Sequence, residues 1–78
     1  MNYYGAPYYF SGGSWYRPHG SLFTVVTPPL GLMISFLPDA YTTLWIGGIP
    51  YYRANDVYYR WRPERRAYIV TALPSGYY

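Results

Sequence analysis

The 78-residue chain is small, aromatic and weakly charged: 24% of it is aromatic, including 13 Tyr, and only 12% is charged. A chain of this length forms one domain, which buries only about 60% of its unfolded surface. Because the sequence has no cysteine, it excludes disulfide staples and thiolate metal sites. Abundant aromatic and few charged residues are also the opposite of a disordered composition.

An internal repeat organises the single domain, 1–78. The sequence YYFSGGSWYRP begins at Tyr8, and YYRANDVYYRW begins at Tyr51, 43 positions later. After a two-residue insertion, LFTVVTPPLG at 22–31 aligns with AYIVTALPSG at 67–76. Such a repeat defines the building unit of a fold. The expected divisions are an N-terminal arm at 1–6, a first copy at 8–31, linking strands at 32–50, a second copy at 51–76 and a tail at 77–78.

Glycine and proline interrupt the chain about every ten residues, a spacing typical of sandwiches and barrels. The runs between them are rich in Tyr, Val, Ile, Thr and Trp, which suit a pleated surface. The sequence therefore predicts an all-β fold. It is expected to be a small antiparallel sandwich or barrel of about eight short strands, built from two tandem hairpin-plus-strand repeats. The predicted strands are 7–10, 14–17, 22–27, 32–36, 41–46, 49–53, 57–62 and 67–72.

Three segments are predicted to form hairpin turns because they gather residues that tolerate positive φ. These segments are 11–13, 47–48 and 54–56. Pro63 is suited to the first central position of a turn over 62–65. Each copy is thus expected to be a hairpin followed by a third strand.

The paired tyrosines predict an interaction surface. Adjacent residues on a strand point to opposite faces, so each pair places one ring on each side of a sheet. A domain this small is expected to hide one face of each sheet, which leaves the other rings for contacts with another molecule. Cross-strand ladders that only hold hairpins together are the alternative. The predicted surface comprises Tyr3, Tyr4, Tyr8, Tyr9, Trp15, Tyr16, Tyr51, Tyr52, Tyr58, Tyr59, Trp61, Tyr77 and Tyr78.

All six basic residues are arginines, and five lie in the second copy. Arg60 and Arg62 flank Trp61, so on a strand both guanidinium groups share one face. Arginine stacks on aromatic rings and binds carboxylates or phosphates through two parallel bonds. Arg–Tyr stacking is favoured over a platform for single-stranded nucleic acid, because the net charge is only +3. The predicted basic patch comprises Arg53, Arg60, Arg62, Arg65 and Arg66.

The sequence lacks a catalytic constellation. His19 is the single histidine and lies in a turn-like segment. The three acids lie in predicted turns: Asp39, Asp56 and Glu64. No nucleophile-elbow pattern surrounds the serines, and no paired carboxylates can be placed. We therefore expect no enzymatic activity, no cofactor and no metal site.

Targeting signals are also not apparent. The first ten residues lack the basic region and apolar run of a secretory leader. The longest apolar stretch, 31–37, ends at Pro38 and is far shorter than the roughly 20 residues that span a bilayer. Neither a leader nor a membrane span is expected in this sequence.

Several segments carry a family resemblance: YYFSGGSWYRP, TVVTPPLG, FLPDAYTTLWIGGIPYY and NDVYYR. Together they resemble a bacterial family of envelope or secreted proteins with a tyrosine-rich domain of unknown function. The resemblance covers about residues 8–76. It implies an extracellular or envelope location and brings no established activity.

The leading functional hypothesis is a structural or interaction protein that self-associates, as a filament or envelope assembly. The two copies differ in charge, which favours head-to-tail contact. The segments 3–4 and 77–78 are predicted to pair with edge strands of neighbouring subunits. The alternatives are an aromatic platform for glycan or peptidoglycan and, third, single-stranded nucleic acid binding.

Overall fold

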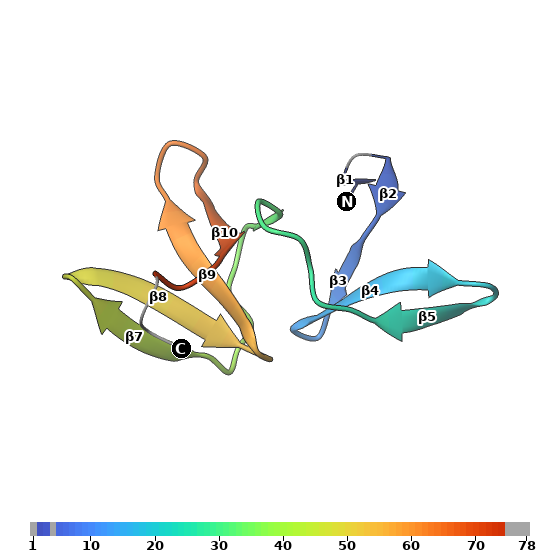
Figure 1. Ribbon diagram of the computed structural model, residues 1–78, viewed down its shortest axis with the longest axis horizontal. Helices are drawn as coiled ribbons and strands as arrows, with labels where there is room; N and C mark the ends of the chain where they lie inside the picture. The colour runs from blue at the N-terminus through green and yellow to red at the C-terminus, as the bar shows by residue number, and fades with distance from the viewer. Residues whose placement is uncertain (1, 4, 75–78) are drawn as a thin grey trace.

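The computed structural model describes residues 2–3 and 5–74, and this part of the chain is built from strands and turns alone (Figure 1). Ten short strands follow one another along the chain. They are β1 (Asn2–Tyr3), β2 (Ala6–Pro7), β3 (Tyr9–Ser11), β4 (Ser14–His19), β5 (Leu22–Val25), β6 (Met33–Ile34), β7 (Thr42–Ile46), β8 (Ile49–Ala54), β9 (Val57–Arg62) and β10 (Ala67–Thr71). The prediction of an all-β fold is confirmed.

The strands form two main antiparallel sheets that remain open. One has the order β3-β4-β5 and the other β6-β10-β9-β8-β7, while β1 and β2 pair separately. In Figure 1 the three-stranded sheet lies on the right and the five-stranded sheet on the left, with the chain from β5 to β6 between them. The principal extents are 44 × 26 × 25 Å. The described strands therefore form a pair of packed sheets, and not a closed barrel.

Two predicted strands differ substantially from the observed ones, and five others shift by one or two residues at one end. The predicted strand 7–10 is split at Tyr8, because β2 pairs with β1 whereas β3 pairs with β4. The predicted strand 32–36 shrinks to β6, whose two residues are those that pair with β10. By contrast, the predicted strand 57–62 coincides with β9.

The hairpin turns follow the predicted chemistry. Positive φ occurs at both central residues of the turns at 12–13, 47–48 and 55–56, as type I′ turns require. Asn55 and Asp56 adopt it without being glycine, in keeping with the tolerance of their short polar side chains. Between β9 and β10 the Arg65 N–H donates to the Arg62 carbonyl at 3.1 Å, which closes the turn begun by Pro63.

Both copies have the same strand register. Tyr9 lies opposite Tyr16 in the first hairpin, and Tyr52 lies opposite Tyr59 in the second. The third strands, β5 and β10, also pair in matching register. Each position of β3 and β4 thus has a structural counterpart 43 residues later, and each position of β5 has one 45 residues later. Among the described strands β10 has a further neighbour, β6, whereas β5 is an edge.

The two copies bury opposite faces in the main core. The first copy contributes Trp15 and Phe10, and the second contributes Tyr59 and Val70. Tyr59 has Tyr16 as its counterpart, and Tyr16 lies on the other side of β4 from Trp15. The two copies therefore meet through non-equivalent faces: the face of the first copy that carries Trp15 packs on the face of the second copy that carries Tyr59.

A second cluster covers the back of the five-stranded sheet. It consists of Ile46, Tyr51 and Leu73, with Leu44 and Tyr58 packed against it. The expectation that only one face of each sheet is hidden is therefore wrong for this sheet. The segment after β10 supplies Leu73, which lets even a small domain cover both faces.

Candidate interaction surface

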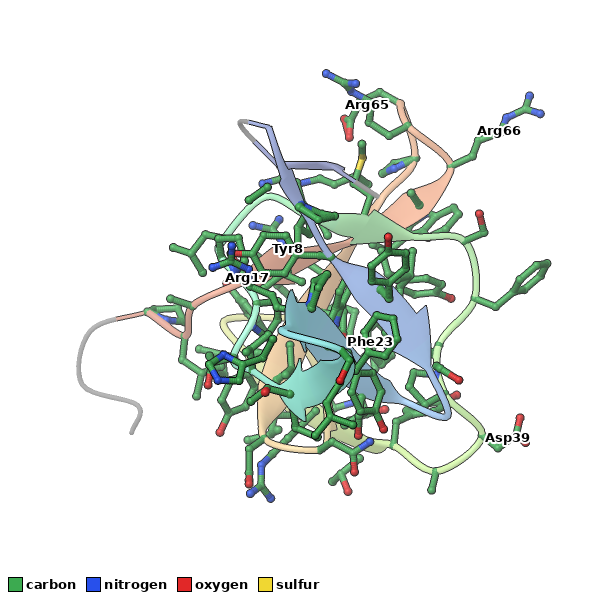
Figure 2. All side chains as sticks on the ribbon, turned by 90° about the vertical axis from the view of Figure 1, so that its right-hand side faces the viewer. Tyr8, Arg17, Phe23, Asp39, Arg65 and Arg66 are labelled. Carbon is green, nitrogen blue, oxygen red and sulfur yellow. The ribbon has the colours of Figure 1, made fainter. Side chains whose placement is uncertain are left out.

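The outward face of the three-stranded sheet is aromatic and exposed. Tyr9, Phe23 and Val25 are 47%, 62% and 64% exposed, respectively. Strand pairing places seven side chains on this face, none of which carries a charge. We call it the open face: Tyr9, Ser11, Ser14, Tyr16, Pro18, Phe23 and Val25. Figure 2 looks onto this side of the molecule, with Phe23 near the centre of the view.

A hollow lies in the open face. It has a volume of about 310 Å³ and is lined by Tyr9, Ser11, Tyr16 and Phe23. The rings of Tyr9 and Phe23 meet edge to face, with centroids 5.4 Å apart and an interplanar angle of 85°. A hollow of this size is at the lower end of the range of ligand sites, roughly 300–1,000 Å³, and suits a single ring system.

The second copy carries the same arrangement, half-buried against the main core. Tyr52 and Tyr68, the counterparts of Tyr9 and Phe23, also meet edge to face, with a centroid distance of 5.6 Å and an angle of 88°. We call the face of the second copy that carries Tyr52, Tyr59 and Tyr68 the covered face. The same aromatic geometry thus occurs twice, once half-buried against the main core and once exposed to solvent.

A tryptophan of the first copy covers this second face. Trp15 is 1% exposed and Tyr59 is 0% exposed. The Trp15 Nε1–H donates a hydrogen bond of 2.8 Å to the Tyr59 hydroxyl. Both polar groups are therefore satisfied without water, as buried groups require. This pair shows how an aromatic side chain docks on such a face.

Burial raises the pKa of the Tyr59 hydroxyl above its usual 10.0, and the hydrogen bond from Trp15 opposes that rise. Below pH 10 both the folded and the unfolded chain keep this proton. Above pH 10 the unfolded chain releases it first, so the free energy of unfolding must fall as the pH rises.

We predict that Tyr59→Phe makes this alkaline loss of stability shallower, by up to about 1.4 kcal/mol per pH unit for one proton. Urea denaturation between pH 9 and 11.5 measures the slope. Tyr41→Phe is the control, because Tyr41 is exposed. Equal slopes for wild type and Tyr59→Phe would contradict the assignment.

A second contact fixes the two hairpins to each other. The Asn55 Nδ2–H donates to the Gly13 carbonyl at 2.7 Å, which joins the turns of the two copies. A Cβ on Gly13 would lie 2.6 Å from that Nδ2 and 3.2 Å from Pro38 Cβ. Glycine therefore permits the close approach of the turns.

Arginine–tyrosine stacking also recurs in both copies. The Arg17 guanidinium carbon lies 5.3 Å from the centroid of Tyr8, and Figure 2 shows the two side chains together. Their counterparts, Arg60 and Tyr51, are 5.7 Å apart. Both distances lie within the range of cation–π contacts.

The five arginines of the predicted basic patch do not converge. Arg53 forms an ion pair with Asp56 beside the β8–β9 turn. Arg65 and Arg66 lie in the turn at the opposite end of β9 and point into solvent (Figure 2). Arg62 is half-buried on β9. Strand pairing keeps Arg53, Arg60 and Arg62 on one face of the sheet, spread along the length of β9, whereas Arg65 and Arg66 lie in the turn beyond it.

The predicted aromatic residues occupy three environments. Trp15, Tyr51 and Tyr59 are core residues and take no part in the exposed surface. The half-buried Tyr8, Tyr52 and Tyr58 pack against the two clusters, and Trp61 tilts against Tyr68 at 4.9 Å. The predictions for Tyr4, Tyr77, Tyr78 and the Tyr3 side chain lie outside the described residues. Among the described members of this set, Tyr9 and Tyr16 lie on the open face.

Several exposed apolar residues were not predicted as part of the surface, among them Phe23, Val25 and Trp45. Trp45, on β7, is 70% exposed. The repeat offset could have identified Phe23, because it aligns with Tyr68. No repeat signal marks Trp45, which lies in the linking segment.

The residues with catalytic potential are scattered. His19 ends β4, and Glu64 lies in the turn after β9. Within residues 2–3 and 5–74, no three His, Cys, Asp or Glu side chains lie together as a metal site would need. The same part of the chain contains no helix long and apolar enough to cross a membrane.

Fold and surface define this molecule as an all-β module with a duplicated meander and one uncovered aromatic face. The model of a family of unknown function, DUF6515, matches residues 1–77, and the chain belongs to that family. No curated protein and no solved structure shows a significant match.

Proposed function

We propose that this chain is a non-enzymatic structural protein that self-associates through its open face. One observation carries the proposal: the counterpart of this face contributes Tyr59 and Val70 to the main core, and its Tyr52–Tyr68 pair packs against that core in the same edge-to-face geometry. The chain thus contains an internal example of how such a face is covered. A second copy of the chain would supply the missing cover.

The energetics of the open face favour association. Burying a side chain such as Phe23 or Val25 contributes roughly 1.5–3 kcal/mol relative to leaving it exposed. The face carries no charged side chain, so covering it requires no charge to be dehydrated. Contiguous exposed apolar surface of this kind marks interaction sites in soluble proteins.

The biological setting we propose is an extracellular or cell-envelope assembly, such as a filament. The resemblance to exported tyrosine-rich proteins supports this location. An aromatic and weakly charged subunit is also suited to a packed assembly, because few charges must be neutralised between neighbours.

Glycan binding at the same hollow is a second candidate. The ring-sized hollow and its aromatic walls favour it, since aromatic rings stack on sugars. Only Ser11 and the two tyrosine hydroxyls would orient sugar hydroxyls there. A soluble peptidoglycan fragment that quenches the intrinsic fluorescence, independently of protein concentration, would support this candidate.

Phe23→Ser is expected to abolish self-association, because it removes the most exposed ring of the open face. Sedimentation velocity over a micromolar concentration series should show larger species for wild type and a monomer for the variant. Phe36→Ser is the matched control, because Phe36 is 83% exposed and lies outside the open face. A wild-type chain that stays monomeric at the highest concentration would contradict the proposal.

A further inference from the structure

Building on the proposed function, we infer that the group entering the open-face hollow is Trp45 of a second copy. The assembly is then head-to-tail: the β7–β8 hairpin of one chain docks on the three-stranded sheet of the next. The inference starts from what already fills the covered face inside the molecule.

The packing of Trp15 on the covered face indicates which kind of side chain would fill the hollow of the open face. Trp15 docks on the covered face with its Nε1–H bonded to Tyr59. Phe10, directly across the hairpin from Trp15, packs against it with ring centroids 4.9 Å apart. The hollow of the open face has Tyr16 in the place of Tyr59. It therefore calls for an indole on a hairpin, with its N–H available to a tyrosine hydroxyl.

Trp45 has the matching position on another hairpin. Trp15 and Phe10 form the second cross-strand pair from the turn at 12–13. Trp45 and Pro50 form the second pair from the turn at 47–48. Trp45 precedes its turn whereas Trp15 follows its own, so the two hairpins present the indole from opposite strands.

Trp45 is also the available indole. It is 70% exposed, compared with 1% for Trp15 and 40% for Trp61. Trp61 already packs on Tyr68. An exposed tryptophan is the residue type most enriched among the dominant contacts of protein interfaces, and its N–H is satisfied once it finds an acceptor.

The positions of donor and acceptor require two molecules. In Figure 1 the β7–β8 turn is at the left end of the molecule and the three-stranded sheet is at the right. Figure 2, viewed from that right end, shows Phe23 of the open face near the centre of the view. With a long axis of 44 Å, a chain cannot fill its own hollow. A heterologous contact of this kind leaves a free donor and a free acceptor, so it propagates as a ring or an open filament.

A complementation experiment tests this inference. Trp45→Ala removes the donor and leaves the acceptor, whereas Phe23→Ser does the reverse. We expect each variant alone to associate at least about 30-fold more weakly than wild type, as loss of a dominant contact implies. An equimolar mixture should form a 1:1 dimer that does not grow, because that dimer has no second functional contact. Trp61→Ala is the matched control and should assemble as wild type does.

Sedimentation velocity of the three samples, with circular dichroism to verify folding, separates the outcomes. If Trp45→Ala assembles as wild type while Phe23→Ser does not, the assignment of Trp45 is wrong and the proposed function stands. A mixture that stays monomeric also overturns the head-to-tail contact. If both variants assemble as wild type, the open face is not the interface and the proposed function fails with the inference.

Discussion

Trp15→Ala is expected to lower the free energy of unfolding by about 3–5 kcal/mol, the range for deleting a large buried aromatic side chain. Trp15 is 1% exposed and joins the two copies through Tyr59. Small domains have total stabilities of roughly 5–15 kcal/mol. The variant should therefore lose a large share of its stability, or unfold at ambient temperature.

Urea denaturation followed by near-ultraviolet circular dichroism measures this loss. At a protein concentration where the wild type is monomeric, Trp45→Ala is the control of the same chemistry at an exposed position, where changes stay within about 0.5 kcal/mol. Trp15→Phe keeps an aromatic ring but removes the pyrrole part of the indole together with the donor to Tyr59, and its loss should be intermediate. A small effect of Trp15→Ala, similar to that of Trp45→Ala, would show that the contact between the copies does not hold the fold together.

Gly13→Ala has the second largest expected effect. Gly13 has a φ of +86°, a region that costs residues with a Cβ roughly 1–2 kcal/mol. The new methyl group would also lie 2.6 Å from Asn55 Nδ2, so the Asn55 side chain must move and we expect the hydrogen bond between the turns to be lost. Loss of that bond leaves a half-buried carbonyl unpaired, which adds about 1–3 kcal/mol.

The neighbouring glycine separates the two effects. Gly12 also has positive φ, +57°, but a Cβ there would meet nothing within 4 Å. Gly12→Ala should thus show only the backbone cost, and the excess loss in Gly13→Ala measures the contact between the turns. Thermal unfolding of both variants gives the comparison. Equal midpoints would mean that the turn-to-turn contact contributes no stability.

Local chemistry explains why the sequence predicted most of the strands. Asn55-Asp56 and the two Gly-Gly pairs select tight hairpin turns without help from distant residues. The β-branched and aromatic runs between them favour extended backbone. The split of the predicted strand 7–10 at Tyr8 was not predictable in this way, because it depends on which distant strand pairs with each half.

The sequence could not predict which face of each strand is buried. Aromatic residues occupy adjacent positions, so the usual alternation of apolar and polar residues along a strand is missing. Tyr58 and Tyr59 are identical residues on opposite sides of β9, yet Tyr59 is fully buried and Tyr58 is only half-buried. The packing of one copy on the other determines which of the two tyrosines is buried, and the sequence of a single strand does not contain that information. For the same reason the candidate surface contained three core residues and omitted Phe23 and Trp45.

The opposite faces used by the two copies make the molecule a short one-dimensional stack. Each copy has one face on which an aromatic side chain of a neighbour can dock, and another face whose side chains can dock on a neighbour. The second cluster, around Tyr51 and Leu73, caps the stack at one end, whereas the open face leaves the other end without a cap. In a stack, stability is a sum of unit terms and nearest-neighbour terms. The first copy, with a single neighbour, is thus the weaker end of an isolated molecule, and becomes an interior unit when another chain joins it.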